Sequence, residues 1–290
     1  MSESPAITAQ EIRTLRRKVW RHYRSHGRHD LPFRRTRDPY RIAVSEIMLQ
    51  QTGVERVRQS YTAWIKRWPS WSALAKATPR QLLTMWSGLG YNRRALYLGS
   101  MARIITKEHC GALPLSQEAL RALPGIGPYS AAAILIFATN APVVTVDINV
   151  RRVILSELGL PSETSHGEVE KIAKLLLPRG RSREWHYAMM DYGSDGLSSD
   201  AKRRYRAKRQ SPFVGSVRQA RGEIIRQLTL RDSFRLSTAL PNAPLERSLT
   251  LQALEDLSRE EIIAIRGNTV RLVSAFEATK LNKKRVRNAS

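Results

Sequence analysis

Two carboxylates stand in segments that are otherwise apolar. Glu46 lies within Ile42-Ala-Val-Ser-Glu-Ile-Met-Leu49, and Asp147 lies within Val143-Val-Thr-Val-Asp-Ile-Asn-Val150. Burial raises the pKa of a carboxyl group, so Glu46 in such a site can hold a proton near neutral pH and donate it to a leaving group. Cleavage of a glycosidic bond uses such an acid with a second carboxylate that stays ionised beside an oxocarbenium-like centre. Two plainer interpretations stay open: Glu46 on the wet face of a helix, and Asp147 as the N-cap of the next helix.

A third segment, Leu123-Pro-Gly-Ile-Gly-Pro-Tyr-Ser130, has the pattern of two helices joined by a tight hairpin. Gly125 and Gly127 permit positive φ angles and a close approach of the backbone, and Pro128 suits the first turn of a helix. Backbone amides at such a helix N-terminus can hold a phosphate group. An ordinary helix-turn-helix bend is the alternative.

The elements that must position these groups are predicted to be helices. Apolar residues recur at helical spacing, as in Leu82, Leu83 and Trp86, and no alternating strand pattern is found before residue 193. Helices are expected at 11–26, 40–51, 54–66, 71–77, 79–86, 92–108, 116–122, 128–138, 147–157, 166–177 and 183–192. The sequence therefore predicts an all-α core.

The charge of the chain restricts its partners. Lys and Arg number 49 against 25 Asp and Glu, a formal net charge of +24, which favours nucleic acid ahead of a membrane surface. No apolar run approaches the roughly 20 residues that cross a bilayer, and the polar N-terminus is not typical of a signal peptide. With Cys110 as its one cysteine the chain has no internal disulfide, so a reducing, cytoplasmic location is expected. The histidines lack ligand spacing, and no metal site is predicted.

The composition changes after Tyr192. Residues 193–212 are polar and then sharply basic, which predicts a linker or a DNA-facing loop, with a solvated loop as the alternative. Further helices are expected at 216–229, 245–257 and 258–264, and a β-hairpin is expected to turn at Gly267-Asn268. Helices that end in a small hairpin favour a winged-helix-like module.

Four motifs follow one another along the chain: Ser45-Glu-Ile-Met-Leu-Gln-Gln-Thr52, Gly88-Leu-Gly-Tyr91, the hairpin at 123–130, and Val146-Asp-Ile-Asn-Val-Arg-Arg152. In order and spacing they resemble the signature of MutY-type adenine DNA glycosylases, a branch of the helix-hairpin-helix (HhH-GPD) base-excision superfamily, over roughly residues 20–195. The resemblance implies a two-lobed all-α core with the active site in the cleft between the lobes. The implied organisation is a disordered 1–10, a core at 11–195 (lobe one about 40–140, lobe two from 11–39 and 141–195), a basic linker at 196–212, a winged-helix-like module at 213–276 and a basic tail at 277–290.

The resemblance also implies catalytic roles. Glu46 matches the general acid of the family, Asp147 the carboxylate that stabilises the cation, and Asn149 a residue that supports the active site. Tyr129 stands where bifunctional relatives carry a Schiff-base lysine. Without that amine, the enzyme is expected to release a base and leave the strand uncut.

DNA contacts are implied by the same motifs. Gln51 and Thr52 fall where the family probes the opposite strand, and Tyr91 falls where it inserts a ring into the base stack. The neighbouring Gln50 is also expected to bind DNA. A packed aromatic and a solvated amide are the plainer interpretations of Tyr91 and Gln51. The hairpin glycines, Gly125 and Gly127, are expected to hold a phosphate of the duplex.

The chain departs from the family at two places outside the motifs. Family members typically bind a [4Fe–4S] cluster on four cysteines after the core, where this chain has none, so no cofactor is expected. The basic run there is predicted to bind phosphates electrostatically through Lys202, Arg203, Arg204 and Arg206. The C-terminal domain with which the family reads 8-oxoguanine is also missing.

The expected base pocket differs from the family as well. His29 and Phe33 stand where the family usually has a basic residue and a tryptophan, and Asn92 replaces a second tyrosine. The expected base pocket is formed by His29, Phe33 and Leu49. These changes bear on which base enters. We expect a monofunctional, monomeric glycosylase acting on double-stranded DNA, with adenine in a mismatch as leading substrate. Thymine or uracil opposite guanine, a modified base such as a modified cytosine, and a non-catalytic helix-hairpin-helix DNA-binding protein are the alternatives.

Overall fold

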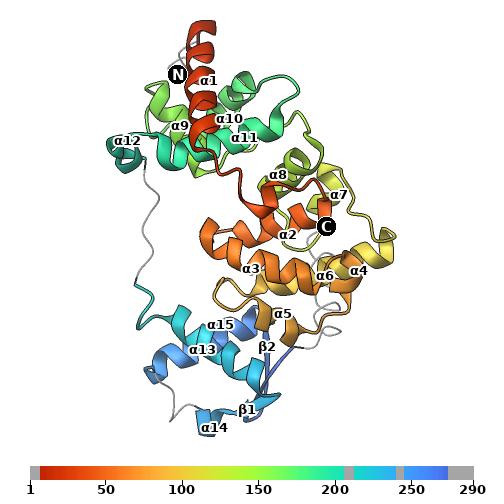
Figure 1. The fold of residues 1–290 in the computed structure, drawn as a ribbon. Coiled ribbons are helices and arrows are strands. Elements are labelled where there is room, and N and C mark those ends of the chain that lie inside the picture. The colour runs from red at the N-terminus through yellow and green to blue at the C-terminus, as the bar shows by residue number, and fades with distance from the viewer. Residues whose placement is uncertain (1–6, 206–211, 240–244, 274–290) are drawn as a thin grey trace. The chain divides into compact units, whose positions relative to one another are not determined.

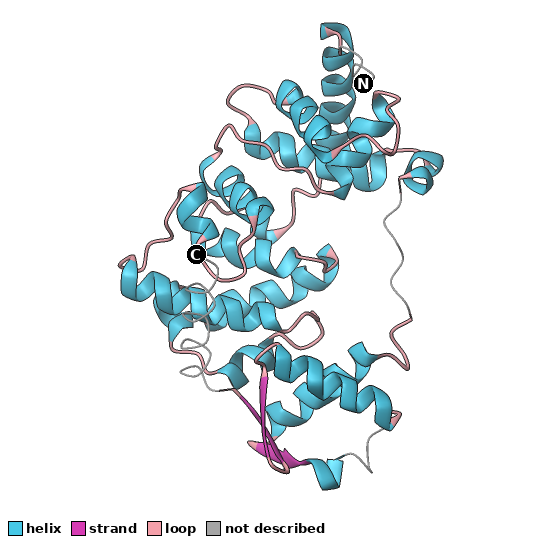
Figure 2. Ribbon diagram, turned by 180° about the vertical axis from the view of Figure 1, so that it is seen from behind, coloured by secondary structure: helices cyan, strands magenta, loops and turns pink. Residues whose placement is uncertain are grey.

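The computed structural model describes residues 7–205, 212–239 and 245–273. Over these residues the chain is helical apart from one small sheet near its C-terminus (Figures 1 and 2), which confirms the predicted all-α core. Two units are distinguished, unit 1 with residues 1–46, 115–122 and 126–209, and unit 2 with residues 47–114, 123–125 and 210–290.

Unit 1 begins with a helix that is fixed at its start by a capping box, in which Thr8 and Glu11 bond each other's backbone N–H. Its elements are α1 (Ala9–His26), the 3₁₀ turn η1 (Pro32–Arg34), α2 (Pro39–Leu49, of which the last three residues belong to unit 2), α7 (Gln117–Arg121), α8 (Pro128–Thr139), α9 (Ile148–Glu157), α10 (His166–Leu176), α11 (Ser182–Asp191), the π-helical turn η2 (Tyr192–Gly196) and α12 (Ser199–Arg204). Val19 of α1 packs with Val153 and Val169, and each of these side chains is fully buried. This core fixes the N-terminus of α9, where Asp147 lies.

Unit 2 contains α3 (Val54–Arg67), α4 (Trp71–Ala75), α5 (Pro79–Met85) and α6 (Arg93–Glu108). Trp64 of α3 and Trp86 after α5 are fully buried and meet edge to face, with their ring centroids 5.4 Å apart. Tryptophans bury the largest apolar area of any side chain. They therefore provide the centre on which the loops after α2 and α5 rest.

The C-terminal module of unit 2 has the element order of a winged helix. Its elements are α13 (Val217–Leu230), β1 (Ser233–Arg235), α14 (Leu236–Ala239), α15 (Arg247–Arg259), β2 (Ile263–Arg266) and β3 (Thr269–Leu272). The strands are antiparallel in the order β1-β3-β2. Helix α13 packs on α5, and an ion pair of 2.8 Å between Arg80 and Asp232 joins the same parts of the unit.

The module differs from the sequence-based prediction at two points. The helix expected at 258–264 is wrong, because α15 ends at Arg259, Glu261 takes a left-handed φ of 60°, and β2 begins at Ile263. Strand β1 and helix α14 were not expected, since three and four residues are too short for a periodic pattern. The hairpin turn at Gly267-Asn268 is confirmed.

Candidate active site

Glu46 lies on α2 and is only partly exposed. Burial, opposed by Arg34 and assisted by the carboxylate of Asp147, raises the pKa of Glu46 to about 8. The side chain therefore carries a proton at neutral pH, as a general acid must. The alternative of a glutamate on a wet helix face does not describe this environment.

Asp147 is the N-cap of α9 and interacts electrostatically with Glu46. Its Oδ1 accepts from the backbone N–H of Val150 at 2.7 Å, and its Oδ2 accepts from Nδ2 of Asn149 at 3.0 Å. Burial raises the pKa of Asp147, while these N–H donors and Arg152 lower it. The N-cap interpretation is thus confirmed, and the capping bonds favour the ionised form of the carboxylate next to Glu46.

Tyr129, near the start of α8, lies in the electrostatic field of both carboxylates. Partial burial, then Asp147, then Glu46 raise the pKa of its phenol well above the ordinary range, and the side chain keeps 39% of its surface exposed. At this position a neutral hydroxyl, and not an amine, therefore interacts with the two acids.

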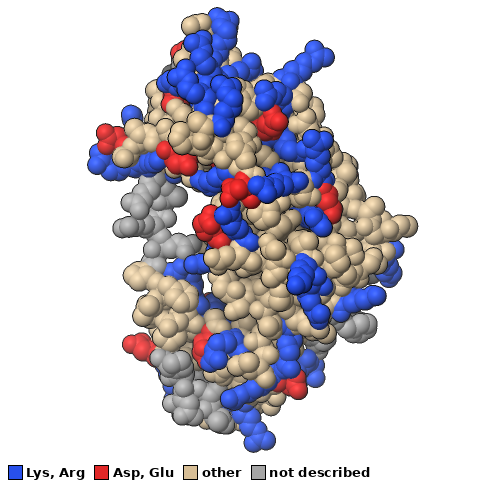
Figure 3. Space-filling model, in the orientation of Figure 1, with Lys and Arg blue, Asp and Glu red and all other residues tan. Residues whose placement is uncertain are grey.

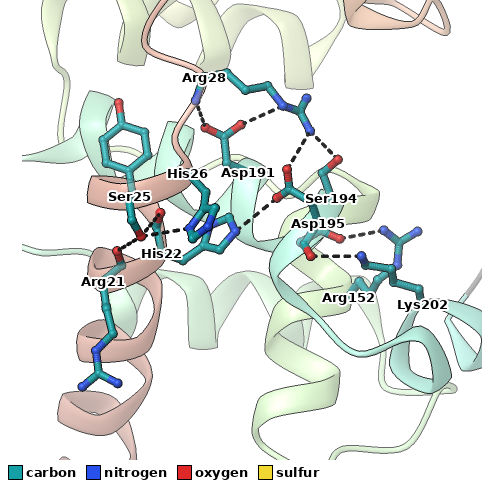
Figure 4. Close-up of polar contacts among 12 residues, drawn as sticks. Arg21, His22, Ser25, His26, Arg28, Arg152, Asp191, Ser194, Asp195 and Lys202 are labelled. Atoms are coloured by element: carbon teal, nitrogen blue, oxygen red, sulfur yellow. Dashed lines mark hydrogen bonds and ion pairs between the residues drawn. The ribbon is translucent and has the colours of Figure 1, made fainter.

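The position of Asn149 is fixed by a chain of contacts from η2. Arg152 donates from Nη1 to Oδ1 of Asn149 at 3.1 Å and to the backbone oxygen of Gly193 at 3.0 Å. A Cβ atom at Gly193 would collide with the backbone oxygen of Asn149. Figure 4 shows Arg152 beside the residues that hold this turn, among them Asp195, which pairs with His22 at 3.3 Å. The turn thereby supports Asn149 and, through it, Asp147.

Sequence reasoning missed a buried ion pair in this site. Arg34 binds Asp191 through two parallel hydrogen bonds of 2.6 and 2.8 Å, and the side chain of Asp191 is fully buried. Arg28 adds a backbone N–H bond of 3.0 Å to Asp191 (Figure 4). The Arg34 guanidinium also lies 4.4 Å above the ring of Tyr187, whose pKa is raised by burial and by Glu46. The signal in the sequence was an acid, Asp191, at the end of the expected helix 183–192.

Two exposed residues of unit 2 take left-handed backbone angles, Gln51 with φ 55° and Tyr91 with φ 46°. Non-glycine residues rarely adopt this region, which is found at functional sites. Tyr91 is 46% exposed. Thr52, in contrast, is buried, and its hydroxyl donates to the backbone oxygen of Leu89 at 3.0 Å.

Arg94 joins the loops that carry these residues, and sequence reasoning missed it. Its buried guanidinium donates at 2.5–3.1 Å to a set of acceptors made of the Thr52 hydroxyl and the backbone oxygens of Ile47, Met48, Gln50, Leu89 and Gly90. Burial lowers the pKa of Arg94 to about 10, so it stays charged at neutral pH. Arg94 ties the end of α2 to the Gly88-Leu-Gly-Tyr91 loop.

The two hairpin glycines differ in conformation. Gly125 has a φ of 79°, and its backbone oxygen accepts from Nε2 of Gln50 at 3.3 Å. Gly127, expected to need the same freedom, is the N-cap of α8 with an ordinary φ of −90°. Pro128 is the first residue of that helix, as predicted.

The three expected base-pocket residues lie in different surroundings. His29 is exposed and its Nε2 lies 2.8 Å from the backbone oxygen of Tyr23. Phe33 is buried within η1, directly before Arg34. Leu49 is the last residue of α2 and is half-buried.

The basic segment after the core is partly engaged with its own neighbours. Lys202 donates to the backbone oxygen of Asp195 at 3.1 Å, and Arg203 pairs with Asp200 at 3.0 Å. Arg204 is exposed, and Arg206 lies outside the described residues. Figure 3 shows further Lys and Arg side chains along α1.

The chain does not fit the four-cysteine cluster of the family, because Cys110 is its single cysteine. Within the described residues no group of three or more His, Cys, Asp or Glu could hold a metal ion. Nor is any described helix long and apolar enough to span a membrane.

Comparison with known proteins identifies the family of the chain. Residues 44–179 match the HhH-GPD superfamily of base excision DNA repair proteins. An adenine DNA glycosylase of Mycolicibacterium smegmatis is 37% identical over 229 residues, which are 72% of this chain and 78% of that protein. The chain belongs to the HhH-GPD superfamily and is a DNA glycosylase. Within the superfamily it resembles the MutY type, since relatives that are 37% and 38% identical to it are adenine DNA glycosylases.

Thymine glycosylases resemble the chain as well. A thymine-DNA glycosylase of Aeropyrum pernix is 32% identical over 187 residues, which are 62% of this chain and 84% of that protein. The solved structure of a thermostable thymine-DNA glycosylase superimposes with a TM-score of 0.58 and 26% identity, over 64% of this chain and 87% of that one. The superfamily is thus shown, while the relatives are named for two different bases.

Proposed function

We propose that this DNA glycosylase is monofunctional, with adenine in a mismatch as its leading substrate. It flips the base from double-stranded DNA, hydrolyses the N-glycosidic bond and leaves an intact abasic site. One observation carries the proposal: Glu46, with a pKa of about 8, stands beside the hydrogen-bonded carboxylate of Asp147. The 37% identity to an adenine DNA glycosylase supports adenine.

The residues divide the work of the reaction. Glu46 gives its proton to a ring nitrogen of the base as the C1′–N bond breaks, and the bonding electron pair leaves with the base. Asp147 stabilises the positive charge that develops on the sugar. Water then adds to C1′ and loses a proton to the Glu46 carboxylate. Tyr129 offers no amine to the opened sugar, so no Schiff base forms.

Thymine or uracil opposite guanine is the second candidate. It is favoured by the thymine-DNA glycosylase of which this chain covers 84% at 32% identity. Modified bases are a further candidate, because Phe33 stands where the family usually has a tryptophan. The test is a panel of duplexes, each with one mismatch or modified base, assayed by alkali cleavage. Fastest cutting at adenine supports the proposal, and fastest cutting at thymine or uracil replaces adenine with the second candidate.

Tyr129→Lys tests the monofunctional assignment. If this side chain faces the sugar, the lysine will form a Schiff base with C1′ once the base has left. We expect strand cleavage without alkali and a borohydride-trapped complex for the variant, and neither for the wild type. Trapping by the wild-type enzyme would show that another amine does this chemistry.

A further inference from the structure

An extended segment of unit 1 carries the chain from α8 to Asp147 without forming a helix or a strand. Helix α8 ends at Thr139 and α9 begins at Ile148. Buried backbone N–H and C=O groups outside regular structure need other hydrogen-bond partners. Thr145 of this segment is buried and lies two residues before Asp147. The partner of the Thr145 backbone therefore controls how the chain approaches Asp147.

Helix α11 provides partners for the backbone of this segment. The hydroxyl of Ser182 donates to the backbone oxygen of Val143 at 3.3 Å. Nε2 of His186 accepts from the backbone N–H of Thr145 at 3.2 Å. Ser182 and His186 are four positions apart and therefore lie on the same face of α11. Of these two bonds, the one made by His186 is nearer to Asp147 along the chain.

The two ring nitrogens of His186 have different roles. Nδ1 lies 2.7 Å from the backbone oxygen of Ser182, which can only accept a hydrogen bond, so Nδ1 carries the proton. Nε2 faces an N–H group, which can only donate, so Nε2 keeps its lone pair. Burial lowers the pKa of this imidazole, although the bond to Ser182 opposes the shift. His186 is thus a neutral ring of one tautomer that serves as acceptor for the Thr145 N–H.

Asp147 is held from both sides along the chain. Its capping bonds to Val150 and Asn149 place the carboxylate relative to α9. On the other side, the bond from Thr145 to His186 places the residues that enter Asp147, whose own backbone is extended with φ −85° and ψ −179°. A shift of either side would turn the side chain. A misplacement of about 1 Å in a reacting group can cost on the order of a hundredfold in rate.

We infer that His186 is a positioning residue for base release, because its bond to the Thr145 backbone holds Asp147 where positive charge develops on the sugar. The inference rests on the proposed role of Asp147 as the stabilising carboxylate. His186 acts through the backbone of Thr145 and not on the substrate. The competing explanation is that His186 is only a hydrogen-bonded residue of the core, which contributes to stability and not to the rate.

The experiment compares three substitutions of His186 in the full chain. The amide oxygen of His186→Gln can take the place of Nε2 and accept from the Thr145 N–H. His186→Met has nearly the same shape, but its thioether is only a weak acceptor. His186→Asn can keep the bond to the Ser182 oxygen and is too short to reach Thr145. Three quantities are measured: the single-turnover rate of base release on the duplex cleaved fastest in the panel above, the Kd for a duplex with a tetrahydrofuran abasic site, and the Tm.

We expect His186→Gln to stay within about threefold of the wild-type rate, and His186→Met and His186→Asn to be at least about tenfold slower, with Kd changed less than about twofold in all three. A control, Tyr205→Phe, removes a buried hydrogen bond of 2.9 Å to the Leu160 oxygen, beyond the C-terminal end of α9. It should lower the Tm and keep the rate. Equal rates for the three His186 variants would overturn the inference, as would an equal loss of rate in Tyr205→Phe. If His186→Met unfolds at the assay temperature, the comparison of His186→Gln with His186→Asn decides.

Asp147→Asn separates this inference from the proposed function. We expect this variant to lose base release and still to bind the abasic-site duplex. A wild-type rate for Asp147→Asn would remove the proposed role of Asp147 and the inference with it. Loss of the rate in Asp147→Asn, together with a wild-type rate for a folded His186→Met, would overturn the inference alone.

Discussion

Glu46→Gln should stabilise the protein at neutral pH although it removes the general acid. Burial raises the pKa of Glu46 from 4.5 to about 8, so the folded protein holds this proton more tightly than the unfolded chain does. The contribution of Glu46 to the free energy of unfolding is therefore fully present below pH 4.5 and is lost as the pH rises toward 8. At 1.36 kcal/mol per pKa unit, the loss is about 1 kcal/mol at pH 5 and about 3 kcal/mol at pH 7. Glutamine does not titrate and escapes this loss.

The assay is thermal unfolding of the wild type and Glu46→Gln from pH 5 to pH 8. Between pH 5 and pH 7 the variant should gain roughly 5–8 °C in Tm relative to the wild type. Glu118→Gln, at an exposed carboxylate of unit 1, should show no such trend. In single-turnover assays the wild-type rate should fall above pH 8, and Glu46→Gln should release no base while still binding abasic DNA. A Tm difference that does not change with pH would refute the raised pKa of Glu46.

Three further outcomes are expected. Arg94→Met leaves a cluster of carbonyl oxygens without a donor and should lower the free energy of unfolding by about 3 kcal/mol in urea titrations; an unchanged midpoint would show that water replaces the guanidinium. Gly193→Ala should slow base release at least tenfold at saturating enzyme by displacing Asn149, whereas Gly222→Ala, with open space around it, should retain the wild-type rate. Alanines in place of the basic residues within 202–206 should flatten the salt dependence of DNA binding, and an unchanged slope would return this segment to a solvated loop.

The helical core was predictable because its apolar residues repeat at helical spacing and its turns carry Gly and Pro. The start of α8 was predicted at Pro128 and lies there. The π-turn η2 was not predicted, since no periodicity distinguishes it from the end of α11. Strand β1 escaped for a similar reason: its three residues gain their structure from pairing with β3, which follows more than thirty residues later.

The candidate site was predictable where its residues lie in motifs and not where they reach it through the fold. Glu46 and Asp147 are recognisable because each is an acid within an apolar segment of the sequence. Arg34 looks like one of several basic residues at 34–37, and its bond to Asp191 spans 157 positions. Arg94 likewise acts on carbonyl groups of the chain, which every residue has. No pattern of residue types in the sequence predicts that a side chain will bind backbone carbonyl groups.

The buried Arg34–Asp191 pair explains how Glu46 can keep its proton beside a cation. An arginine that lacked a partner so close to Glu46 would favour the ionised carboxylate and lower its pKa. Asp191 instead accepts two hydrogen bonds from the guanidinium, at 2.6 and 2.8 Å, and is itself fully buried. The charge of Arg34 is thus largely compensated, and the pKa of Glu46 stays near 8 because burial outweighs what remains. At Asp147, burial also raises the pKa, but the N–H donors of Val150 and Asn149 and the charge of Arg152 oppose it. The donors around Asp147 favour its ionised form, whereas burial favours the protonated form of Glu46, and this difference suits the first carboxylate to the role of anion and the second to the role of acid.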